Sequence, residues 1–239
     1  MSAYLNLTEV LLTIEKALRE RSPLSLVRVG DGENIVLAQR SVWKMRRVLR
    51  ERWAIKANKG EKGVTLPNIK LRNDLVRAIR RASIVGILPA GDDQIKAPAY
   101  LKRPLTNKVF AHFKLKPAVT CHACVNRMMP RTPLFWEILQ RQRVLIVTRY
   151  PEPLKAVLES DPYYLHVTHT VAFSHYDQMD SAMKEIAAID DEFDIALLSC
   201  GVNAVVLAPR IAAATGKVAI DFGKGPEQIG AAARKLKRP

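Results

Sequence analysis

Residues 24–35 of the chain, LSLVRVGDGENI, change character in their middle. The first six residues are mostly Val and Leu, which predicts a buried β-strand. Gly-Asp-Gly-Glu ends this strand, and a helical pattern of apolar residues follows directly. Two carboxylates, Asp31 and Glu33, therefore stand at the end of a buried strand in a chain whose formal net charge is +15. This placement raises the question of what the two acids do there.

Similar apolar segments recur along the chain, with helical patterns between them. Alternation of this kind, without consecutive hairpins, is typical of parallel strands joined by crossover helices. We therefore predict an α/β fold with a Rossmann-like, doubly wound, mostly parallel sheet of about six or seven strands flanked by helices. The segments that predict strands are SLVRV (25–29), SIVGIL (83–88), PAVTC (117–121), RVLIVT (143–148), YLHVTHTVAF (164–173), DIALLS (194–199) and KVAIDF (217–222). Those that predict helices are residues 7–21, 71–82, 153–160, 177–189 and 203–215.

Length and composition limit the classes of protein that fit. The chain has 239 residues, of which 48% are hydrophobic, which is enough for one large α/β core. No stretch approaches the roughly 18 consecutive apolar residues that a membrane-spanning helix needs. Glu9 lies where a secretory signal would need an apolar centre. We therefore expect one domain over residues 1–239 and a cytoplasmic location, with the three cysteines as reduced thiols.

The charge balance predicts attraction to polyanions, because 38 Lys and Arg outnumber 23 Asp and Glu. Nucleic acid, anionic lipid headgroups and phosphorylated substrates all fit this excess, and ordinary solvated helix faces would also explain it. Much of it lies in residues 44–62, in RAIRRA (77–82) and in KLKRP (235–239). We expect a basic helix over residues 44–52, on the acceptor side of the site, that contacts either the anionic inner face of a membrane peripherally or a phosphate-bearing acceptor.

A basic nucleic-acid-binding α/β protein is the alternative class. The segment SVWKMRRVLRERW (41–53) interleaves Trp43 and Trp53 with arginines, an arrangement that could stack on bases. Trp residues in such a segment more commonly face the core or anchor an amphipathic surface. We therefore do not expect nucleic acid as the partner.

The residues that follow each predicted strand are the polar, glycine-rich parts of the chain. In open parallel α/β sheets, ligands bind beyond the carboxyl ends of the strands. These segments read GDGEN, PAGDD, CHACVNR, TRYPEP, SHYD, SCGVN and DFGKG, and they bring to one edge of the sheet Asp31, Glu33, Asp92, His122, Arg149, Asn203 and Asp221. The sequence therefore predicts a ligand site at this edge.

Two interpretations of the carboxylate pair remain open. On an extended exit from the strand, Asp31 and Glu33 would point the same way and could converge on a hard cation such as Mg²⁺ or Mn²⁺. Gly30 and Gly32 would then let the backbone approach that ligand closely. Alternatively, Asp31 caps the following helix and Glu33 lies in its first turn, near the positive end of the helix dipole.

The late segments allow similar pairs of interpretations. SCGVN (199–203) follows a predicted strand and opens an Ala-rich helix, so the backbone N–H groups around Gly201 and Asn203 could receive a phosphate or a sugar hydroxyl. The same residues could serve only tight packing, with Asn203 as a helix cap. Asp221, at the end of the last predicted strand, could hold a hydroxyl, act as a base or fix a turn.

Three segments taken in order resemble the bacterial GT-D-fold glycosyltransferases. They are RVGDGE (28–33), SCGVNAVVLAPRIAAATGK (199–217) and KVAIDFGKG (217–225). In that family an RxGDGE-like stretch carries a D-x-E metal motif, and a glycine-containing turn precedes a final strand that ends in Asp-x-Gly. The resemblance extends from about residue 5 to residue 225, with a weakly matched middle.

The resemblance implies a metal-dependent transfer of a sugar from a nucleotide-diphosphate-sugar donor, a UDP-sugar first of all, to a hydroxyl of a bacterial glycan, glycoprotein or lipid-linked acceptor. Residue by residue, it implies that Asp31 and Glu33 bind Mn²⁺ or Mg²⁺ and the donor, with Arg28 and Gly30 shaping the site. Arg28 could equally be paired with a carboxylate in a structural role.

Two further constellations are weaker. Cys121-x-x-Cys124 and His166-x-x-His169 supply the ligand types of a structural zinc site, but an i, i+3 pair in a strand faces opposite sides. The Gly-x-Gly of GDGE also suggests a Rossmann-type methyltransferase or dinucleotide enzyme. However, Ile35 stands where the third glycine belongs, and the second strand ends in ILPAG without the expected acid.

Overall fold

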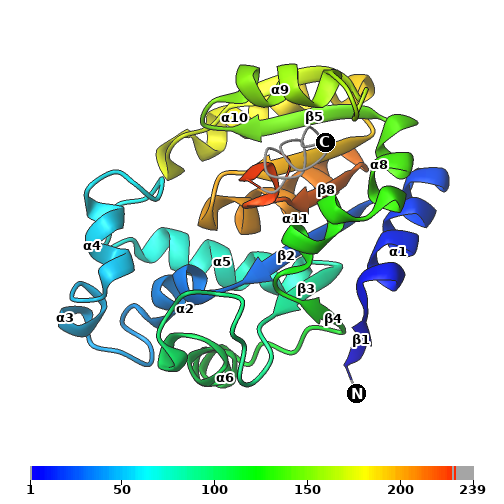
Figure 1. Ribbon diagram of the computed structural model, residues 1–239. Coiled ribbons are helices and arrows are strands. Elements are labelled where there is room, and N and C mark those ends of the chain that lie inside the picture. The colour runs from blue at the N-terminus through cyan, green and yellow to red at the C-terminus, as the bar shows by residue number, and fades with distance from the viewer. Residues whose placement is uncertain (1, 228, 230–239) are drawn as a thin grey trace, which may run out of the picture.

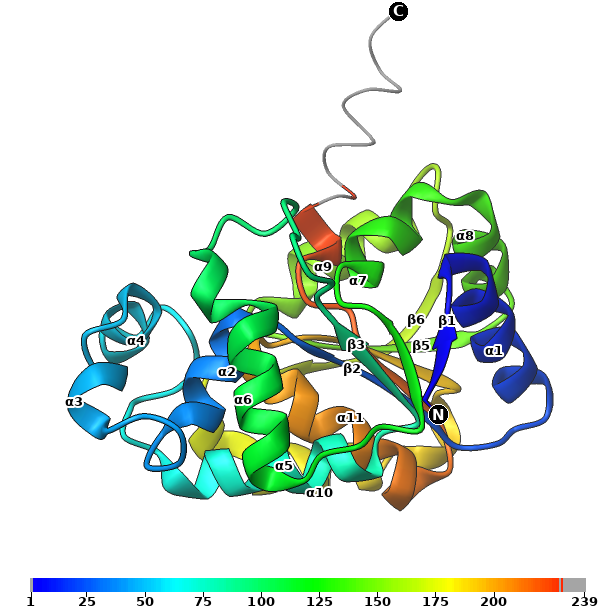
Figure 2. The ribbon, with the colours of Figure 1, turned by 90° about the horizontal axis from the view of Figure 1, so that it is seen from below.

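The chain forms one sheet of eight parallel strands with helices on both faces (Figures 1 and 2). This computed structural model describes residues 2–227 and 229, so the basic KLKRP segment lies outside the described residues. The strands are β1 (Ala3–Leu5), β2 (Leu24–Val29), β3 (Ile84–Ile87), β4 (Val119–His122), β5 (Arg143–Thr148), β6 (His166–Ala172), β7 (Ile195–Ser199) and β8 (Val218–Asp221). The predicted Rossmann-like α/β class is confirmed.

All seven predicted strands are present, and the sheet has an eighth strand, β1, at its edge. β1 pairs with β4, with Ala3 opposite Val119. It has only three residues, of which two are exposed. Such a short edge strand has no alternating or continuous apolar pattern, and for that reason the sequence did not predict it.

The helices include the five that the sequence predicts and several that it does not. The predicted ones are α1 (Leu7–Arg19), α5 (Ile69–Arg81), α9 (Pro151–Glu159), α10 (Met179–Ala187) and α11 (Val202–Thr215). The additional ones are α2 (Asp31–Ala38), α3 (Met45–Val48), α4 (Arg52–Asn58), α6 (Arg103–Phe113), α7 (Val125–Met128) and α8 (Pro133–Gln140). Four single turns of 3₁₀-helix are η1 (Ala99–Leu101), η2 (Met129–Arg131), η3 (Tyr176–Gln178) and η4 (Asp190–Glu192).

The expected basic helix over residues 44–52 is wrong in its bounds. The segment forms two short helices, α3 and α4, because Glu51 has extended backbone angles (φ −67°, ψ 136°) and starts a new helix. The helices α6 and α8 each carry a proline in the first turn. Proline is well tolerated there, although in a sequence pattern it suggests a break.

Two apolar layers cover the two faces of the sheet. Successive residues of a strand alternate between them: Leu26 and Ile146 pack on the face covered by α1 and α8, whereas Val27 and Leu145 pack on the opposite face. Figure 2 shows α5, α10 and α11 on that second face. Because both faces are buried, the strands contain almost continuous apolar runs.

The strand order β1-β4-β3-β2-β8-β7-β5-β6 places β2 in the middle of the sheet. From β2 the chain adds β3 and β4 on one side, builds β5, β6 and β7 on the other, and returns with β8 between β2 and β7. The chain segments that follow β2 and β8 therefore leave the sheet at a topological switch point. Ligands of open parallel sheets bind at such a point, beyond the carboxyl ends of the strands.

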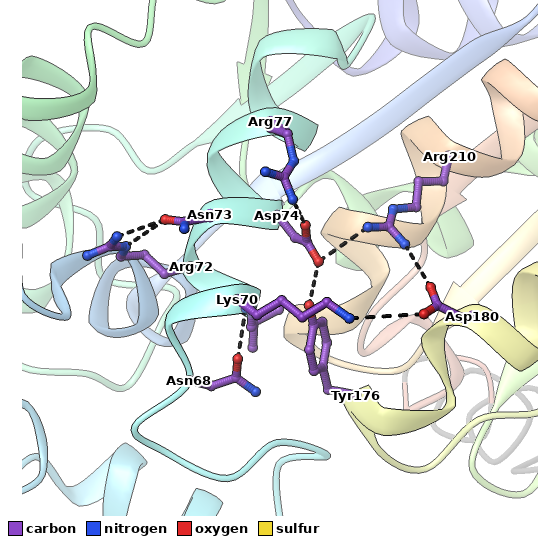
Figure 3. A network of polar contacts seen from close by, with 10 residues as sticks. Asn68, Lys70, Arg72, Asn73, Asp74, Arg77, Tyr176, Asp180 and Arg210 are labelled. Carbon is purple, nitrogen blue, oxygen red and sulfur yellow. Dashed lines mark hydrogen bonds and ion pairs between the residues drawn. The ribbon is translucent and has the colours of Figure 1, made fainter.

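A buried carboxylate joins the helices of one face (Figure 3). Asp74 of α5 accepts a hydrogen bond from the Tyr176 hydroxyl of η3 and pairs with Arg77. It also pairs with Arg210 of α11 at 3.2 Å, and Arg210 reaches Asp180 of α10 at 3.6 Å. Burial, followed by the bond to Asp74, raises the pKa of Tyr176. The network fixes three helices relative to the 3₁₀ turn that follows β6.

Helices long and apolar enough to cross a bilayer are absent from the described part of the chain.

Candidate functional site

A cleft of about 420 Å³ lies beyond the carboxyl ends of β2, β7 and β8, at the switch point of the sheet. The GDGE turn after β2 and the SCGVN turn after β7 both line it, although some 170 residues separate them in the chain. Gly223 and residues 61–63 also line it, together with residues from the segments that follow β3, β4, β5 and β6. The charged residues that line the cleft are Arg28, Asp31, Glu33, Glu61, Lys62, Arg127, Arg149, Lys224 and Glu227.

The GDGE turn starts a helix, not an extended exit from the strand. Gly30 is the N-cap, with extended backbone, and α2 begins at Asp31. The carboxylate of Glu33 accepts a hydrogen bond of 2.8 Å from the N–H of Gly30, which closes the first turn. Residues i and i+2 of a helix are about 200° apart. The expectation that Asp31 and Glu33 point the same way from an extended segment is therefore wrong, and so is the expectation that Asp31 is the cap.

Both carboxylates nevertheless line the cleft. The side chain of Asp31 makes no hydrogen bond or ion pair with another described residue, so its carboxylate is available to a ligand. Gly32, between them, lies against the indole of Trp53, since a Cβ there would be 2.6 Å from the indole nitrogen. Only glycine fits this contact between α2 and α4.

An ion pair between the two central strands forms the floor beside Glu33. Arg28 of β2 donates to the carboxylate of Asp221 of β8 at 2.8 Å, and also to its carbonyl at 3.2 Å. A further hydrogen bond, of 3.0 Å, joins Arg28 to Asn126, which in turn donates to the carbonyl of Phe222 at 3.0 Å. Gly223 has φ of +48°, and a Cβ there would overlap the Arg28 guanidinium. The position therefore requires glycine.

The electrostatics of the site centre on Glu33. Burial, reinforced by the negative charge of Asp221, raises the pKa of Glu33 to about 7, and Arg28 opposes this shift. Burial also raises the pKa of Asp221, against the lowering effect of Arg28. A carboxylate whose pKa lies near neutrality is ready either to exchange a proton or to accept a cation.

The SCGVN turn presents the start of a long helix to the cleft. Gly201 is the N-cap of α11 with φ of +62°, a backbone conformation that favours glycine. The fourteen-residue helix α11 therefore directs its free N–H groups and its positive dipole end toward the site. This is the backbone arrangement that favours a phosphate.

Asn203 does not reach the cleft. Its side chain is fully buried, and its amide donates to the carbonyl of Gly63 at 2.9 Å. The same carbonyl accepts from the N–H of Tyr176 at 2.9 Å. Asn203 thus fixes the loop that carries Lys62 over the cleft.

Several cleft residues were not singled out from the sequence. Trp53 and Lys62 come from the connection between β2 and β3, away from the strand ends and within a charged run. Lys224 lies in the DFGKG segment after β8, but Asp221 was the residue chosen there. Arg149 was at a strand end, and its guanidinium donates to the carbonyls of Gly60 and Ser174 at 3.1 and 3.3 Å.

The cleft carries unpaired cations as well as acids. Lys224 pairs with Glu227 at 3.2 Å, and Glu61 pairs with Lys56 at 3.5 Å. Within the described part of the chain, no carboxylate pairs with the cleft residues Lys62, Arg127 and Arg149. Together with the start of α11, these cations suit a polyanionic ligand such as a diphosphate.

The donor set limits the kind of metal that could bind. Among residues 2–227 and 229, no group of three or more His, Cys, Asp or Glu is placed to hold a metal ion. Mg²⁺ commonly takes only one or two protein carboxylates and completes its shell with water and substrate phosphates. Asp31 and Glu33 both line the cleft and supply this number of oxygen ligands. In donor type and number they fit a hard cation that binds together with a diphosphate, although their side chains leave α2 in different directions.

The structure excludes a zinc site made of the two cysteines and two histidines. Cys121 and Cys124 are at the end of β4, near one edge of the sheet, whereas His166 and His169 belong to β6 at the opposite edge. His169 instead contacts Glu192 at 2.6 Å.

A larger cavity, of about 670 Å³, lies beside β1 and β4. Lys116 and His122 line it, but no carboxylate does, and it is away from the junction of β2 with β8. The smaller cleft is the better candidate, since it combines the switch point, a perturbed carboxylate and the start of a helix.

Comparisons with known proteins agree with this fold. The profile of the GT-D fold-like domain matches residues 5–229. No curated protein matches the chain. One similar solved structure, described as a new glycosyltransferase (DUF1792) from Streptococcus sanguinis, is 14% identical over 98% of this chain and 86% of its own, with a TM-score of 0.58. Another, described as the domain of unknown function 1792 with a distinct glycosyltransferase fold, is 15% identical over 98% of this chain and 82% of its own, with a TM-score of 0.59.

Proposed function

Because the chain belongs to the GT-D-like family, a family of glycosyltransferase fold, we propose that it transfers a sugar from a nucleotide-diphosphate-sugar donor to an acceptor hydroxyl. The observation that supports this most directly is the convergence of the GDGE and SCGVN turns on one cleft at the switch point of the sheet. A diphosphate placed there would meet both carboxylates of α2 and the start of α11.

We assign the donor to the walls of the cleft that carry positive charge. The N–H groups at the start of α11 would bind a phosphate, and Lys62 and Arg149 would balance the charge of the diphosphate. Gly30, Gly32 and Gly201 would allow close approach of the backbone. Asn203 would contribute indirectly, by holding the Lys62 loop. By resemblance, a UDP-sugar is the donor that we expect.

Asp31 and Glu33 are the residues that would hold a divalent cation, Mn²⁺ or Mg²⁺. Such an ion would supply Lewis-acid stabilisation of the charge that develops on the departing nucleotide diphosphate. Arg28 would add a fixed positive charge next to Glu33, and Asp221 would keep the Arg28 guanidinium in place. Asp221 could bind the acceptor hydroxyl only if its bond to Arg28 were broken. We therefore assign Asp221 the role of positioning Arg28.

The acceptor in this proposal is a glycan, a glycoprotein or a lipid-linked sugar of a bacterial glycan pathway. The chain would act on it as a single catalytic domain. A proton must leave the acceptor hydroxyl as the glycosidic bond forms. If Asp31 alone held the cation, Glu33, whose pKa is about 7, would be the cleft carboxylate best able to accept this proton near neutral pH.

Isothermal titration calorimetry with uridine, guanosine and adenosine diphosphates, with and without Mn²⁺, tests the proposal. We expect one nucleotide to bind, and Mn²⁺ to strengthen its binding by about tenfold or more. The Asp31→Asn variant should keep the metal-independent binding and lose the enhancement. Equal weak binding of all polyanions, with an affinity that falls steeply with salt, would instead identify a nucleic-acid binder.

A further inference from the structure

The helices α3 and α4 lie at one end of the molecule, beyond α2 and outside the layers that cover the sheet (Figures 1 and 2). We call residues 44–59 the basic projection. These sixteen residues contain seven Lys or Arg and one Glu. They therefore carry a net charge of +6, out of +15 for the whole chain, in less than a tenth of its length.

The exposed side chains of the basic projection form two stripes, each with one aliphatic residue and two cations. In α4, Arg52, Ile55 and Lys59 recur at intervals of three and four residues, so they share one face. The opposite face buries Ala54 and Ala57. Ile55 is thus an exposed aliphatic side chain flanked by two exposed cations.

The second stripe runs from α3 into the turn that follows it. Arg46 lies three residues before Leu49 and four before Arg50, and all three are exposed. Leu49 is 36% exposed and Ile55 is 45% exposed. Each stripe therefore presents one aliphatic residue next to two cations.

The acids nearby do not neutralise these stripes. Glu51 accepts a hydrogen bond from the Tyr100 hydroxyl at 2.9 Å, and Glu61 pairs with Lys56 at 3.5 Å. Among the described residues, Arg46, Arg50 and Arg52 have no carboxylate partner. The charge of the stripes is therefore available to an anionic surface.

The positions of the aromatic residues in the basic projection favour a membrane over a nucleic acid as its partner. Trp43 is buried, and the Arg47 guanidinium covers its ring at 4.0 Å. Trp53 lies against Gly32 at the cleft. Neither ring is free to stack on a base, as a binder of single-stranded nucleic acid requires. The exposed apolar groups are aliphatic, and these insert into the boundary between lipid headgroups and acyl chains.

We propose that the basic projection is a docking surface for an anionic lipid bilayer, with Leu49 and Ile55 inserted among the lipids and the cations on their headgroups. The same helix, α4, carries Trp53 at the wall of the cleft. Docking would therefore hold the cleft close to the membrane surface, where a lipid-linked acceptor lies. That last step, the class of acceptor, rests on the proposed function, whereas the docking surface does not.

Flotation with vesicles of phosphatidylcholine alone, or with about a quarter of phosphatidylglycerol, tests the docking surface. The chain should float with the anionic vesicles only, and less so at high salt. Each cation near an anionic surface adds about a fivefold gain in partitioning. Arg46→Gln with Arg50→Gln should therefore weaken binding at least tenfold. The matched control is Arg19→Gln with Lys108→Gln, which removes two exposed cations elsewhere.

A second pair of variants tests the aliphatic residues. Leu49→Ser with Ile55→Ser should weaken binding about fivefold or more without changing the charge. Leu12→Ser with Val157→Ser is the matched control, because these side chains are 49% and 39% exposed on other helices. It should bind vesicles as the parent does.

Two results would overturn the proposal: equal flotation with neutral and anionic vesicles, or unchanged binding of the Leu49→Ser, Ile55→Ser variant. The second would indicate a purely electrostatic surface for a soluble polyanion. Calorimetry of the nucleotide diphosphate on the same variants separates the two proposals. If the parent protein did not bind the nucleotide diphosphate, the proposed function would be rejected. The flotation result would still decide whether the basic projection is a docking surface.

Discussion

At the scale of single residues, Glu33 is both a structural and a chemical element of the cleft. Its carboxylate closes the first turn of α2 through the N–H of Gly30, and its pKa is about 7. Glu33→Gln keeps an acceptor for that hydrogen bond and removes the charge. We expect turnover to fall by two or more orders of magnitude, while the free energy of unfolding changes by less than about 1 kcal/mol near neutral pH. Near-normal sugar transfer by this variant would reject the metal role.

The raised pKa of Glu33 also predicts how stability depends on pH. An acid whose pKa is higher in the folded than in the unfolded protein stabilises the fold fully below its unfolded pKa, and this contribution is lost as the pH rises through its folded pKa. For Glu33 the loss falls between about pH 4.5 and 7. We expect Glu33→Gln to lack this loss, so its stability relative to the parent should increase over that interval. Urea titrations across it provide the measurement, and parallel curves would contradict the raised pKa.

Arg28 and Asp221 form the second residue-scale test. Removing one member of a buried ion pair costs about 3–5 kcal/mol, because the other charge is left without a partner. Arg28→Ala and Asp221→Ala should each lower the free energy of unfolding by about that amount. The double variant should lose clearly less than the sum of the two. Strict additivity in denaturant unfolding would mean that the pair does not act as a unit.

The sequence identified several of these residues, because short polar turns after apolar strands are visible in one dimension. Asp31, Glu33 and Gly201 are such cases. Trp53 is different. Its place in the cleft depends on the contact of α4 with Gly32, which is decided by tertiary packing. The partner of Arg28 was likewise open, since Asp221 is 193 residues away in the chain.

At the scale of elements, the seven apolar strands and the longest helices were predictable, whereas β1, α6 and the short helices were not. Those seven strands are mostly buried, so their apolar runs are visible in the sequence, and α5 and α11 have the length that periodic patterns require. The segment 44–52 was expected as one basic helix. It instead contains α3 and the first residue of α4, because Glu51 has an extended backbone, which helix propensities do not predict.

The hydrogen bonds and ion pairs of Asp74 predict how strongly the contacts between helices stabilise the fold. Asp74 joins α5 to α11 through Arg210 and to η3 through Tyr176 (Figure 3). Asp74→Asn keeps the size of the side chain and removes the buried charge that these partners require. We expect a loss of about 3 kcal/mol in the free energy of unfolding. Asp180→Asn is the control, and it should cost less than about 1 kcal/mol because that carboxylate is exposed. Equal effects of the two substitutions would contradict the role of Asp74.

At the scale of the whole molecule, the cleft depends on both halves of the sheet. β2 with α2 comes from the first 40 residues, whereas β7, α11 and β8 come from the last 45. The Arg28–Asp221 pair and the bond from Asn203 to Gly63 cross between them. The halves that build the cleft are thus tied together at the cleft itself.

This connection predicts how a ligand acts on the unfolding of the chain. A nucleotide diphosphate with Mn²⁺ at about 100 times its Kd should stabilise the folded protein by about 2.7 kcal/mol. For a chain of this length, that corresponds to a rise in Tm of roughly 5–10 °C. Because each half supplies cleft residues, neither can unfold without releasing the ligand, and the whole transition should move as one in differential scanning calorimetry. Glu33→Gln at the same concentrations should show a much smaller rise. A transition that split in two, with only one part shifted by the ligand, would mean that one half of the sheet alone forms the site.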